Sequence, residues 1–413
     1  MKYLFTLIFF ILVSCDNSII LIYPDSDDFG ELNNYKPLTA DIIDLLEGVY
    51  KSETTNRQLG DSIVLLSVRN KLLILTAQSP DFLILEGGVA DSGIVFLGYG
   101  RDYETNSISR NRVFIPMENG ASDLLNGIKS SQIKIIINTL TGNNNNKNNS
   151  NFVVNYNYYR DINKKGNFNV IAHRAGGRNS DLLPHSENSL GMIKFAEFLG
   201  ANGIEIDIRL TKDKIPVLFH DDFLSKRLVD GDLLIGNIES YYLSHLNSFC
   251  KLKSGELIPT LEEAFNTVID STNLSLVWLD IKHVQVVEPI IPIIIKYQEI
   301  AKSKNRDLRI IFGITSEQVM QKFISFSGNF DIESLNELSI EEIYKSKSRI
   351  WAPQWTLGYQ NEIVNDLISK GIISFVWTLD DRKFVKEFLQ NASFNGILTN
   401  YAPIVAYEYY VSK

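Results

Sequence analysis

From about residue 166 onward, the sequence alternates short apolar runs with segments of helical periodicity, and no other feature restricts the possible folds as strongly. We interpret eight apolar runs as strands: FNVIAH, GIEIDI, IPVLFH, LSLVWLDI, LRIIFGI, RIWAPQW, IISFVWTL and NGILTN. Helical spacing is found between them in ENSLGMIKFAEFLG, in TLEEAFNTVID and in an isoleucine-rich segment near 286–302. Thr260 and Glu263 have the spacing of a capping box, which predicts that a helix begins there. Strands that alternate with helices predict a parallel sheet covered by helices.

Eight strands within residues 166–413 match the size and pattern of a (β/α)8 barrel. The alternative is an open doubly wound sheet, which needs a glycine-rich phosphate-binding turn after its first strand if it is to bind a nucleotide. The sequence HRAGGR follows the first strand and is not such a turn. The barrel is therefore the preferred prediction.

Residues 38–162 have a different character and predict a small all-β domain, either a sandwich or a barrel. Short β-branched and aliphatic runs are separated there by turn sequences such as RNK, EGG and SG. The polar segment TGNNNNKNNSN (141–151) lies between two strand-like flanks, which predict a hairpin with a long tip. An interdomain linker is the alternative, but strand pattern resumes directly after the segment. This domain contains no catalytic cluster, and its sequence identifies no partner.

The N-terminus reads as a targeting segment. MKYLFTLIFFILVSC begins with the basic Lys2, and its apolar run is too short to span a bilayer comfortably. The end LVSC resembles the lipobox of bacterial lipoproteins, which implies cleavage before Cys15 and attachment of lipid to it. A plain signal peptide and an anchor helix are the alternatives. We expect a signal peptide over 1–14, a tether over 15–37 and a membrane-anchored protein of the cell envelope, periplasmic or surface-facing.

Composition restricts the partners and the cysteine chemistry. The 413-residue chain has a net charge of −9 and no Lys/Arg cluster, which argues against nucleic-acid binding. Cys250 is the only cysteine besides Cys15, so lipidation leaves no intramolecular disulfide. We expect Cys250 to be a buried or half-buried small apolar residue.

Titratable side chains stand at the ends of the predicted strands, where a (β/α)8 barrel carries its active site. These residues are His173, Glu205, Asp207, His220, Asp280 and Lys282. Glu205 and Asp207 are two positions apart, so they share one face of their strand. Carboxylates that face one another repel, and a divalent cation removes that repulsion. Three carboxylates suit Mg²⁺ or Ca²⁺, and two histidines suit a general acid and a general base.

The same residues lie in motifs that resemble those of the glycerophosphodiester phosphodiesterases. AHRAGGRNSDLLPHSENS and GIEIDIRLTKDKIPVLFHDD carry the motifs in the family's order: His173-Arg174, Glu187-Asn188, Glu205 with Asp207, Thr211-Lys212-Asp213 and His220-Asp221. IPTLEEAF, LDIK, WTLDD and GILTNYAP resemble later segments of the family. The similarity covers roughly residues 168–405.

This resemblance implies a TIM barrel of the phospholipase-C-like phosphodiesterase type and metal-dependent hydrolysis of glycerophosphodiesters to glycerol 3-phosphate and an alcohol. By the resemblance, Glu205, Asp207 and Asp280 hold the ion, and His173 and His220 transfer protons. Arg174 and Lys282 face the phosphate, and Trp377 either lines the mouth or belongs to the core. Glu187 supports the loop after the first strand. Asp221 is expected to bond the backbone, with a catalytic role as the alternative.

Several positions depart from the family pattern: Asp280 replaces Glu, Asn400 replaces Asp, Ala175 and Lys214 replace Gly, and two residues separate Pro184 from Glu187. None of these changes removes a titratable catalytic group, so we predict an active enzyme. Phospholipase C- or D-like cleavage of a phospholipid head group is one alternative, and a non-catalytic surface lipoprotein is the other.

Overall fold

The structure is a computed structural model that describes residues 21, 23, 24, 26–141, 151–162, 168–231, 233–327 and 330–412. Cys15 and the predicted signal peptide lie outside the described residues, so the lipidation site stays a prediction. Within the described ranges, no helix combines the length and the apolar character that crossing a bilayer requires.

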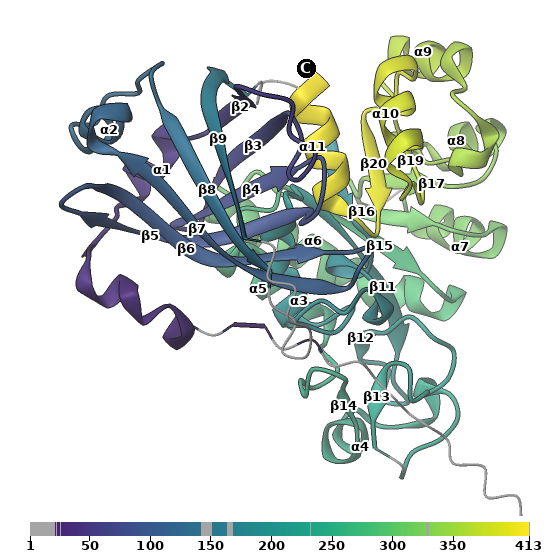
Figure 1. The fold of residues 1–413 in the computed structure, drawn as a ribbon. Coiled ribbons are helices and arrows are strands. Elements are labelled where there is room, and N and C mark those ends of the chain that lie inside the picture. Colours follow the sequence, from purple (N-terminus) through teal and green to yellow (C-terminus); the bar gives the residue numbers. More distant parts are fainter. Residues whose placement is uncertain are drawn as a thin grey trace, which may run out of the picture.

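The N-terminal domain is a closed antiparallel barrel, which decides between the two architectures expected for it (Figure 1). Its strands run in the order β5-β4-β3-β2-β9-β8-β7-β6, and pairing of β5 with β6 closes the ring. They are β2 (Gly48–Ser52), β3 (Ser62–Val68), β4 (Lys71–Thr76), β5 (Phe82–Ala90), β6 (Gly93–Asp102), β7 (Ser107–Pro116), β8 (Lys134–Thr141) and β9 (Asn151–Arg160). Closure pairs β5 with β6, so neither of these two long strands is left as an open sheet edge.

Two short helices and a hairpin complete this β-barrel. Residues of α1 (Ala40–Leu45) and α2 (Ala121–Leu125) belong to the same apolar cluster as the side chains inside the barrel. The hairpin prediction is confirmed, because β8 and β9 pair antiparallel up to Leu140 and Asn151.

The segment predicted to be a tether is folded where the structure describes it. A 3₁₀ segment spans Ser26–Asn34, and β1 (Lys36–Pro37) pairs with the far end of β5. Tyr23 donates a hydrogen bond to the carbonyl oxygen of Leu182 at 2.9 Å, and its ring packs edge-on against Tyr99. Tyr23 and the described residues from 26 onward therefore lie on the folded protein.

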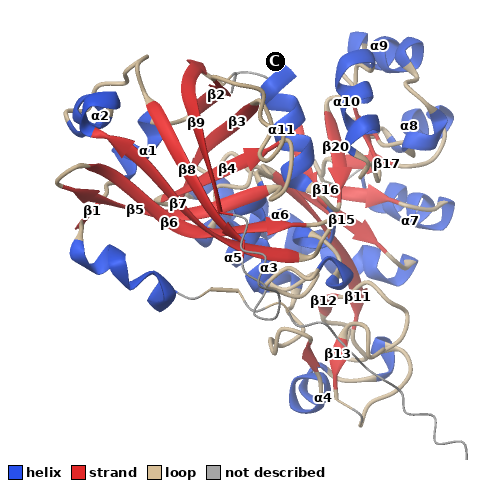
Figure 2. Cartoon of the chain, viewed as in Figure 1, coloured by secondary structure: helices blue, strands red, loops and turns tan. Residues whose placement is uncertain are grey.

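The second domain is a (β/α)8 barrel, as predicted, in which β10 and β11 pair to close the ring (Figure 2). Its parallel strands are β10 (Asn169–Ala172), β11 (Gly203–Leu210), β15 (Leu276–Ile281), β16 (Arg309–Ile314), β17 (Ser334–Asn336), β18 (Ile350–Trp351), β19 (Ile373–Val376) and β20 (Gly396–Thr399). The helices that follow in this domain are α3 (Leu190–Phe195), α4 (Leu243–Phe249), α5 (Leu261–Ser271), α6 (Val287–Ser303), α7 (Glu317–Ser327), α8 (Ile340–Ser346), α9 (Asn361–Ser369), α10 (Arg382–Asn391) and α11 (Ala402–Ser412). The capping box of Thr260 and Glu263 begins α5.

One predicted barrel strand is wrong. The run IPVLFH contains β12 (Pro216–Leu218), which pairs antiparallel with β11 outside the ring. Five residues separate β11 from β12, and a parallel pair would need a crossover of a dozen or more. The vacant place in the ring is filled by β17, whose sequence SLN is too short and too polar to stand out as a strand.

A small insertion follows β12 and projects from the barrel (Figure 1). It contains β13 (Val229–Asp230), β14 (Lys251–Leu252) and α4, and it has an apolar cluster of its own. Cys250 is buried in that cluster, as predicted.

The two faces of the barrel strands follow the alternation expected for β structure. Ile204, Ile206 and Ile208 of β11 point outward into the cluster shared with the helices. Trp278 of β15 fills the barrel interior. Gly313 of β16 makes room for it, because a Cβ atom at that position would lie 2.8 Å from the Trp278 Nε1 atom.

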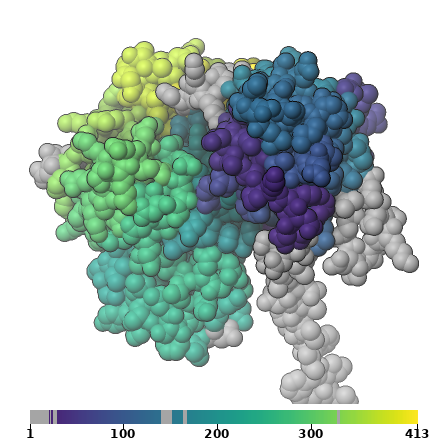
Figure 3. Space-filling model, turned by 90° about the vertical axis from the view of Figure 1, so that its left-hand side faces the viewer, coloured from purple at the N-terminus to yellow at the C-terminus, as the bar shows by residue number. Residues whose placement is uncertain are grey.

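The two barrels lie side by side and share one apolar cluster (Figure 3). Outward-facing Val64 and Leu66 of β3 and Leu73 and Leu75 of β4 belong to it, and α11 lies against these two strands. The β-barrel is thus packed onto the (β/α)8 barrel over apolar side chains.

Candidate active site

Three carboxylates meet at the carboxyl end of the (β/α)8 barrel. Glu205 and Asp207 lie on β11, and Asp280 lies on the neighbouring β15 with its Cα paired to that of Asp207. One oxygen from each of the three lies within 4.8 Å of the others. Asp280 therefore reaches the cluster although it is one methylene shorter than the glutamate of the family pattern.

Each buried carboxylate of β11 has one oxygen held by a neighbour. The backbone N–H of Arg174 donates to Glu205 Oε2 at 2.7 Å, and the Asn188 amide donates to Asp207 Oδ2 at 2.6 Å. The other oxygen of Glu205, Oε1, is buried and accepts no hydrogen bond from any described residue. An unbonded buried carboxylate oxygen is costly, so this atom marks a position suited to a cation.

Lys282 is the cation that faces the three carboxylates. Its Nζ atom lies 2.7 Å from Asp207 Oδ1 and 2.6 Å from Asp280 Oδ2. Burial disfavours the ammonium form, but Asp207, Asp280 and Glu205 outweigh burial and raise the pKa of Lys282 above its ordinary value. Burial and the negative charges of Asp207 and Asp280 raise the pKa of Glu205 well above its ordinary value. The ammonium of Lys282 alone therefore does not remove the mutual repulsion of the three carboxylates.

His173 is fixed in one tautomer by a chain of hydrogen bonds. The Asn400 Nδ2 group donates to Asp380 Oδ2 at 2.7 Å, which turns the Asn400 Oδ1 atom toward His173. The His173 Nδ1 atom lies 2.8 Å from that oxygen, so it carries the proton. Its Nε2 atom, 3.7 Å from Glu205 Oε2, has a free lone pair. Burial, with help from Arg174 and Lys282, lowers the pKa of His173 to about 4.

His220 has the same tautomer as His173, but its contacts with Arg174 and Asp221 fix it. Its Nε2 atom lies 2.8 Å from the Arg174 Nη2 atom, and a guanidinium only donates, so Nε2 accepts. The Nδ1 atom then carries the proton and donates to Asp221 Oδ1 at 2.8 Å. His220 reaches the mouth from the loop after β12 and not from a barrel strand.

Arg174 is held by the buried Glu187. Its Nη1 group donates to Glu187 Oε1 at 2.8 Å, and Arg227 forms two further hydrogen bonds to the same carboxylate. Arg174 and Ala175 both have positive φ values, 52° and 69°. The turn therefore keeps the left-handed backbone that favours glycine, although neither residue is glycine.

The predicted backbone contact of Asp221 is wrong. Its carboxylate accepts hydrogen bonds from the side chains of His220, Ser225 and Arg227. Burial alone would raise the pKa of Asp221, but hydrogen bonds from Arg227 and His220 lower it to about 2. Asp221 thus stays ionised beside the His220 ring.

The sequence reasoning overlooked three residues of the site: Asp380, Arg227 and Glu337. Asp380 lies within the quoted WTLDD motif, so its place after a strand was a usable signal. Arg227 lies in the insertion, and Glu337 follows the strand that was overlooked. Neither of these two belongs to a motif quoted for the family.

Trp377 has both of the roles considered for it. Its ring packs against the apolar cluster inside the barrel, and its Nε1 group donates to the carbonyl oxygen of Ala352 at 2.7 Å. The residue also lines an open pocket at the mouth.

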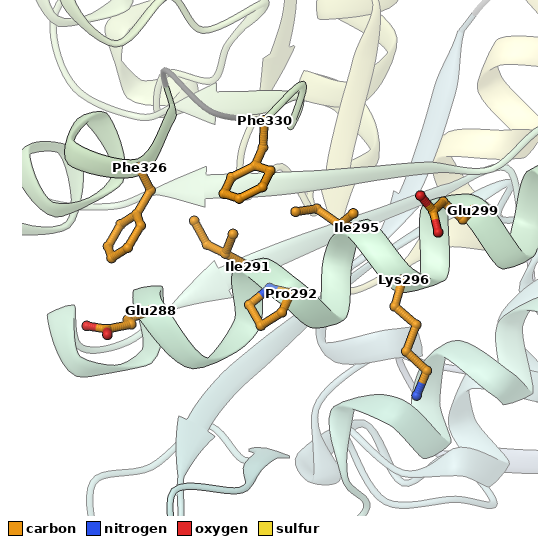
Figure 4. Close-up of a pocket in the computed structure, with 8 residues that line it drawn as sticks. All are labelled: Glu288, Ile291, Pro292, Ile295, Lys296, Glu299, Phe326 and Phe330. Carbon is orange, nitrogen blue, oxygen red and sulfur yellow. The ribbon is translucent and has the colours of Figure 1, made fainter.

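A second hollow lies on the outer helices and contains none of these groups. Figure 4 shows apolar side chains of α6, including Ile291 and Ile295, facing Phe326 of α7 and Phe330. The hollow has a volume of about 450 Å³. Because no carboxylate of the cluster and no histidine lines it, the chemistry belongs to the mouth.

Comparison with known proteins shows which family the chain resembles. Residues 173–403 match the glycerophosphoryl diester phosphodiesterase family. A glycerophosphodiester phosphodiesterase of Caldanaerobacter subterraneus subsp. tengcongensis is 30% identical over 237 residues, which are 56% of this chain and 93% of the relative. Glycerophosphodiester phosphodiesterase 1 of Homo sapiens is 37% identical over 100 residues, which are 23% of this chain and 28% of the human protein. A structure of an Oleispira antarctica phosphodiesterase in complex with the product sn-glycerol-3-phosphate is 22% identical, with a TM-score of 0.47 and coverage of 57% of this chain and 94% of the other.

Proposed function

This chain belongs to the glycerophosphoryl diester phosphodiesterase family of phosphoric diester hydrolases, and we propose that it hydrolyses glycerophosphodiesters to glycerol 3-phosphate and an alcohol by metal-dependent acid–base catalysis. One observation supports the proposal most strongly. Three carboxylates and two histidines, each histidine held in one tautomer, lie together at the same barrel mouth.

The residues present fit a divalent cation. Glu205, Asp207 and Asp280 offer oxygen ligands only, the set that Mg²⁺ and Ca²⁺ prefer. The unbonded Glu205 Oε1 atom and the mutual repulsion of the carboxylates both support this assignment. A bound divalent ion supplies Lewis-acid polarisation of a phosphoryl oxygen.

We assign the role of general base to His173. Its lowered pKa keeps the ring neutral at neutral pH, so the Nε2 lone pair is available to take a proton from the nucleophile. Asn400 and Asp380 keep the Nδ1 proton in place and prevent the ring from turning.

We assign the role of general acid to His220. Its Nδ1 group donates to the Asp221 carboxylate, so Nε2, the ring nitrogen beside Arg174, is the atom from which a proton would pass to the leaving alcohol oxygen. Arg174 and Lys282 supply positive charge next to the two histidines and the carboxylates, where phosphate oxygens would have to lie.

The test is an assay of the full chain for release of glycerol 3-phosphate from glycerophosphodiesters, after EDTA treatment and after addition of Mg²⁺ or Ca²⁺. We expect activity only with added ion, and loss of activity in His173→Ala and in His220→Ala with melting temperatures close to that of the wild type. Full activity in both variants would contradict the acid–base assignment. Release of a head group from intact phospholipid, without cleavage of glycerophosphodiesters, would favour the phospholipase alternative.

We also propose that lipid on Cys15 anchors the protein in the cell envelope. The support is the sequence LVSC after a short apolar run. Labelling cells that express the wild type or Cys15→Ser with a fatty-acid analogue tests this proposal. Equal labelling of both proteins would contradict it.

A further inference from the structure

The loop 177–189, between β10 and α3, determines where Arg174 lies. The Glu187 carboxylate of this loop accepts a hydrogen bond from Arg174 at 2.8 Å. Glu187 is held in turn by Asn179, whose backbone N–H donates to Glu187 Oε2 at 2.8 Å and whose Oδ1 atom accepts from the Glu187 N–H at 2.8 Å. The loop also contains the departure from the family pattern in which two residues separate Pro184 from Glu187. The position of Arg174 therefore depends on how the loop is held.

Two side chains from outside the (β/α)8 barrel bind the middle of this loop. Arg101, near the end of β6 in the β-barrel, donates through its Nη2 group to the carbonyl oxygen of Asp181 at 2.8 Å. The Tyr23 hydroxyl donates to the next carbonyl oxygen, that of Leu182, at 2.9 Å. Two consecutive carbonyl groups of the loop are thus fixed by residues that precede the (β/α)8 domain in the sequence.

Arg101 is fully buried, and several hydrogen bonds hold its side chain in one place. Its Nη2 group also donates to Asn106 Oδ1 at 2.8 Å, and its Nη1 group donates to the carbonyl oxygen of Asp102. A charged donor forms a stronger hydrogen bond than a neutral one, and burial keeps away the water that would compete for the acceptor. The contact of Arg101 with Asp181 is therefore suited to fixing the loop.

Asp81 and Tyr103 lie next to Arg101 at the same end of the β-barrel. The Asp81 N–H donates to the carbonyl oxygen of Arg101 at 2.8 Å, and the Tyr103 N–H donates to Asp81 Oδ2 at 2.9 Å. We call Asp81, Arg101 and Tyr103 the interdomain group. Because its members are bonded to one another, their contacts with the (β/α)8 barrel form one unit.

The interdomain group also contacts the surroundings of Asn400, which orients His173. The Tyr103 ring packs against the ring of Tyr401, the residue after Asn400, with 4.8 Å between the ring centroids. Asp81 Oδ1 accepts a hydrogen bond at 3.2 Å from Arg382, the first residue of α10. The β-barrel therefore contacts three separate segments at the mouth of the (β/α)8 barrel.

We propose that the β-barrel positions the active site, and that Arg101 is a positioning residue that acts on Arg174 through the loop 177–189. Arg101 fixes the carbonyl group of Asp181 within the loop, and the loop keeps Glu187 against Arg174. The inference rests on the proposed function and deepens it, because in that function Arg174 faces the phosphate beside His220. It assigns a role to the domain whose sequence identified no partner.

The test compares two variants that remove an arginine contact between the same two domains. Arg101→Met keeps much of the side-chain length and removes the donors. The matched control is Arg160→Met, because Arg160 of β9 donates to the carbonyl oxygens of Tyr410 and Val411 at the far end of α11, at 2.8 and 3.0 Å. With glycerophosphocholine and added Mg²⁺ or Ca²⁺, we expect kcat/KM to fall about tenfold in Arg101→Met, since misplaced groups slow the reaction. Arg101→Lys should recover part of the loss, and Arg160→Met should keep the wild-type value.

A double-mutant cycle separates positioning from a general loss of stability. In a Glu187→Gln background the path from the loop to Arg174 is already weakened, so adding Arg101→Met should lower kcat/KM much less than it does in the wild type. Equal fold-changes in both backgrounds would contradict an action of Arg101 through Glu187.

Hydrogen exchange measured by mass spectrometry tests the same coupling without any catalysis. Backbone amides of residues 177–189 should exchange faster in Arg101→Met than in the wild type and in Arg160→Met. Tyr23→Phe removes a single hydroxyl and should accelerate exchange in the same loop to a smaller degree, so it decides the question if Arg101→Met does not fold. Unchanged exchange in the loop, or equal acceleration in Arg160→Met, would overturn the proposal. Absence of hydrolysis by the wild type would count against the proposed function alone, because the exchange result does not depend on it.

Discussion

The Nδ1 atom of His173 lies 2.8 Å from the side-chain oxygen of Asn400. An asparagine oxygen accepts a hydrogen bond without adding a negative charge, so it fixes the tautomer and leaves the lowered pKa of His173 in place. Asn400 is itself oriented by two hydrogen bonds to Asp380. The departure from the family pattern at this position therefore keeps a positioning role for the residue.

We predict that Asn400→Leu lowers kcat/KM by about 10- to 100-fold, by analogy with the loss of outer-shell partners that orient metal-binding histidines. The His173 ring would lose its fixed Nδ1 donor contact and populate the other tautomer. Steady-state assays, with the melting temperature as a check on folding, measure the effect. Asn247→Leu, an exposed asparagine of α4, serves as control and should retain wild-type kinetics. Wild-type kinetics in Asn400→Leu would contradict the positioning role.

The carboxylate cluster predicts opposite effects of one substitution with and without metal. In EDTA, Glu205→Gln should raise the free energy of unfolding by about 1 kcal/mol, because it replaces a carboxyl whose ionisation is disfavoured in the folded protein by burial and by Asp207 and Asp280, as its raised pKa indicates. With Mg²⁺ or Ca²⁺ the wild type should gain stability and the variant should gain less. Thermal melts in EDTA and in each ion measure both effects.

A variant that is destabilised in both conditions would show that Glu205 supports the fold without an ion. The matched control is Glu197→Gln, a buried glutamate outside the cluster that is paired with Arg69. It should show no difference between EDTA and added ion.

The sequence predicted most barrel strands and the carboxylate cluster, but it did not reveal the residues that hold the site through long-range hydrogen bonds. Seven of the eight runs interpreted as barrel strands are in the ring, because each is a longer apolar run than β17. The error at β12 came from judging a run by its composition and not by the five residues that precede it. Glu205 and Asp207 were found because two-residue spacing on a strand places side chains on one face, and Asp280 was found because it ends another predicted strand. Asp380 bonds Asn400, 20 residues away in the sequence, and Arg227 bonds Glu187, 40 residues away. No local sequence pattern encodes contacts over such separations.

The lowered pKa of Asp221 predicts how its contribution to stability depends on pH. The folded protein holds this pKa at about 2, against an ordinary value of 3.8. The contribution is therefore full above pH 3.8 and is lost as the pH falls toward 2. Asp221→Asn should reduce the free energy of unfolding by about 1 kcal/mol at pH 6, since the group is partly exposed.

Urea denaturation at pH 6, 4 and 3 would follow the difference between the wild type and Asp221→Asn, which should shrink at the lowest pH. Asp230→Asn removes an exposed ion pair with Lys253 and should show a small difference at every pH. A difference for Asp221→Asn that stays constant down to pH 3 would mean that the contact does not depend on its charge.

Lys214 occupies a turn where the family pattern has glycine, and its φ of 64° lies in the left-handed region. A side chain at such a φ costs about 1 kcal/mol that glycine does not. The Lys214 side chain is exposed, so its removal leaves no cavity. Lys214→Gly should therefore raise the free energy of unfolding by about 1 kcal/mol, measured by urea denaturation. Lys212→Gly, two positions earlier and without a positive φ, should lower it, and a loss of stability in both variants would show that the turn at Lys214 carries no strain.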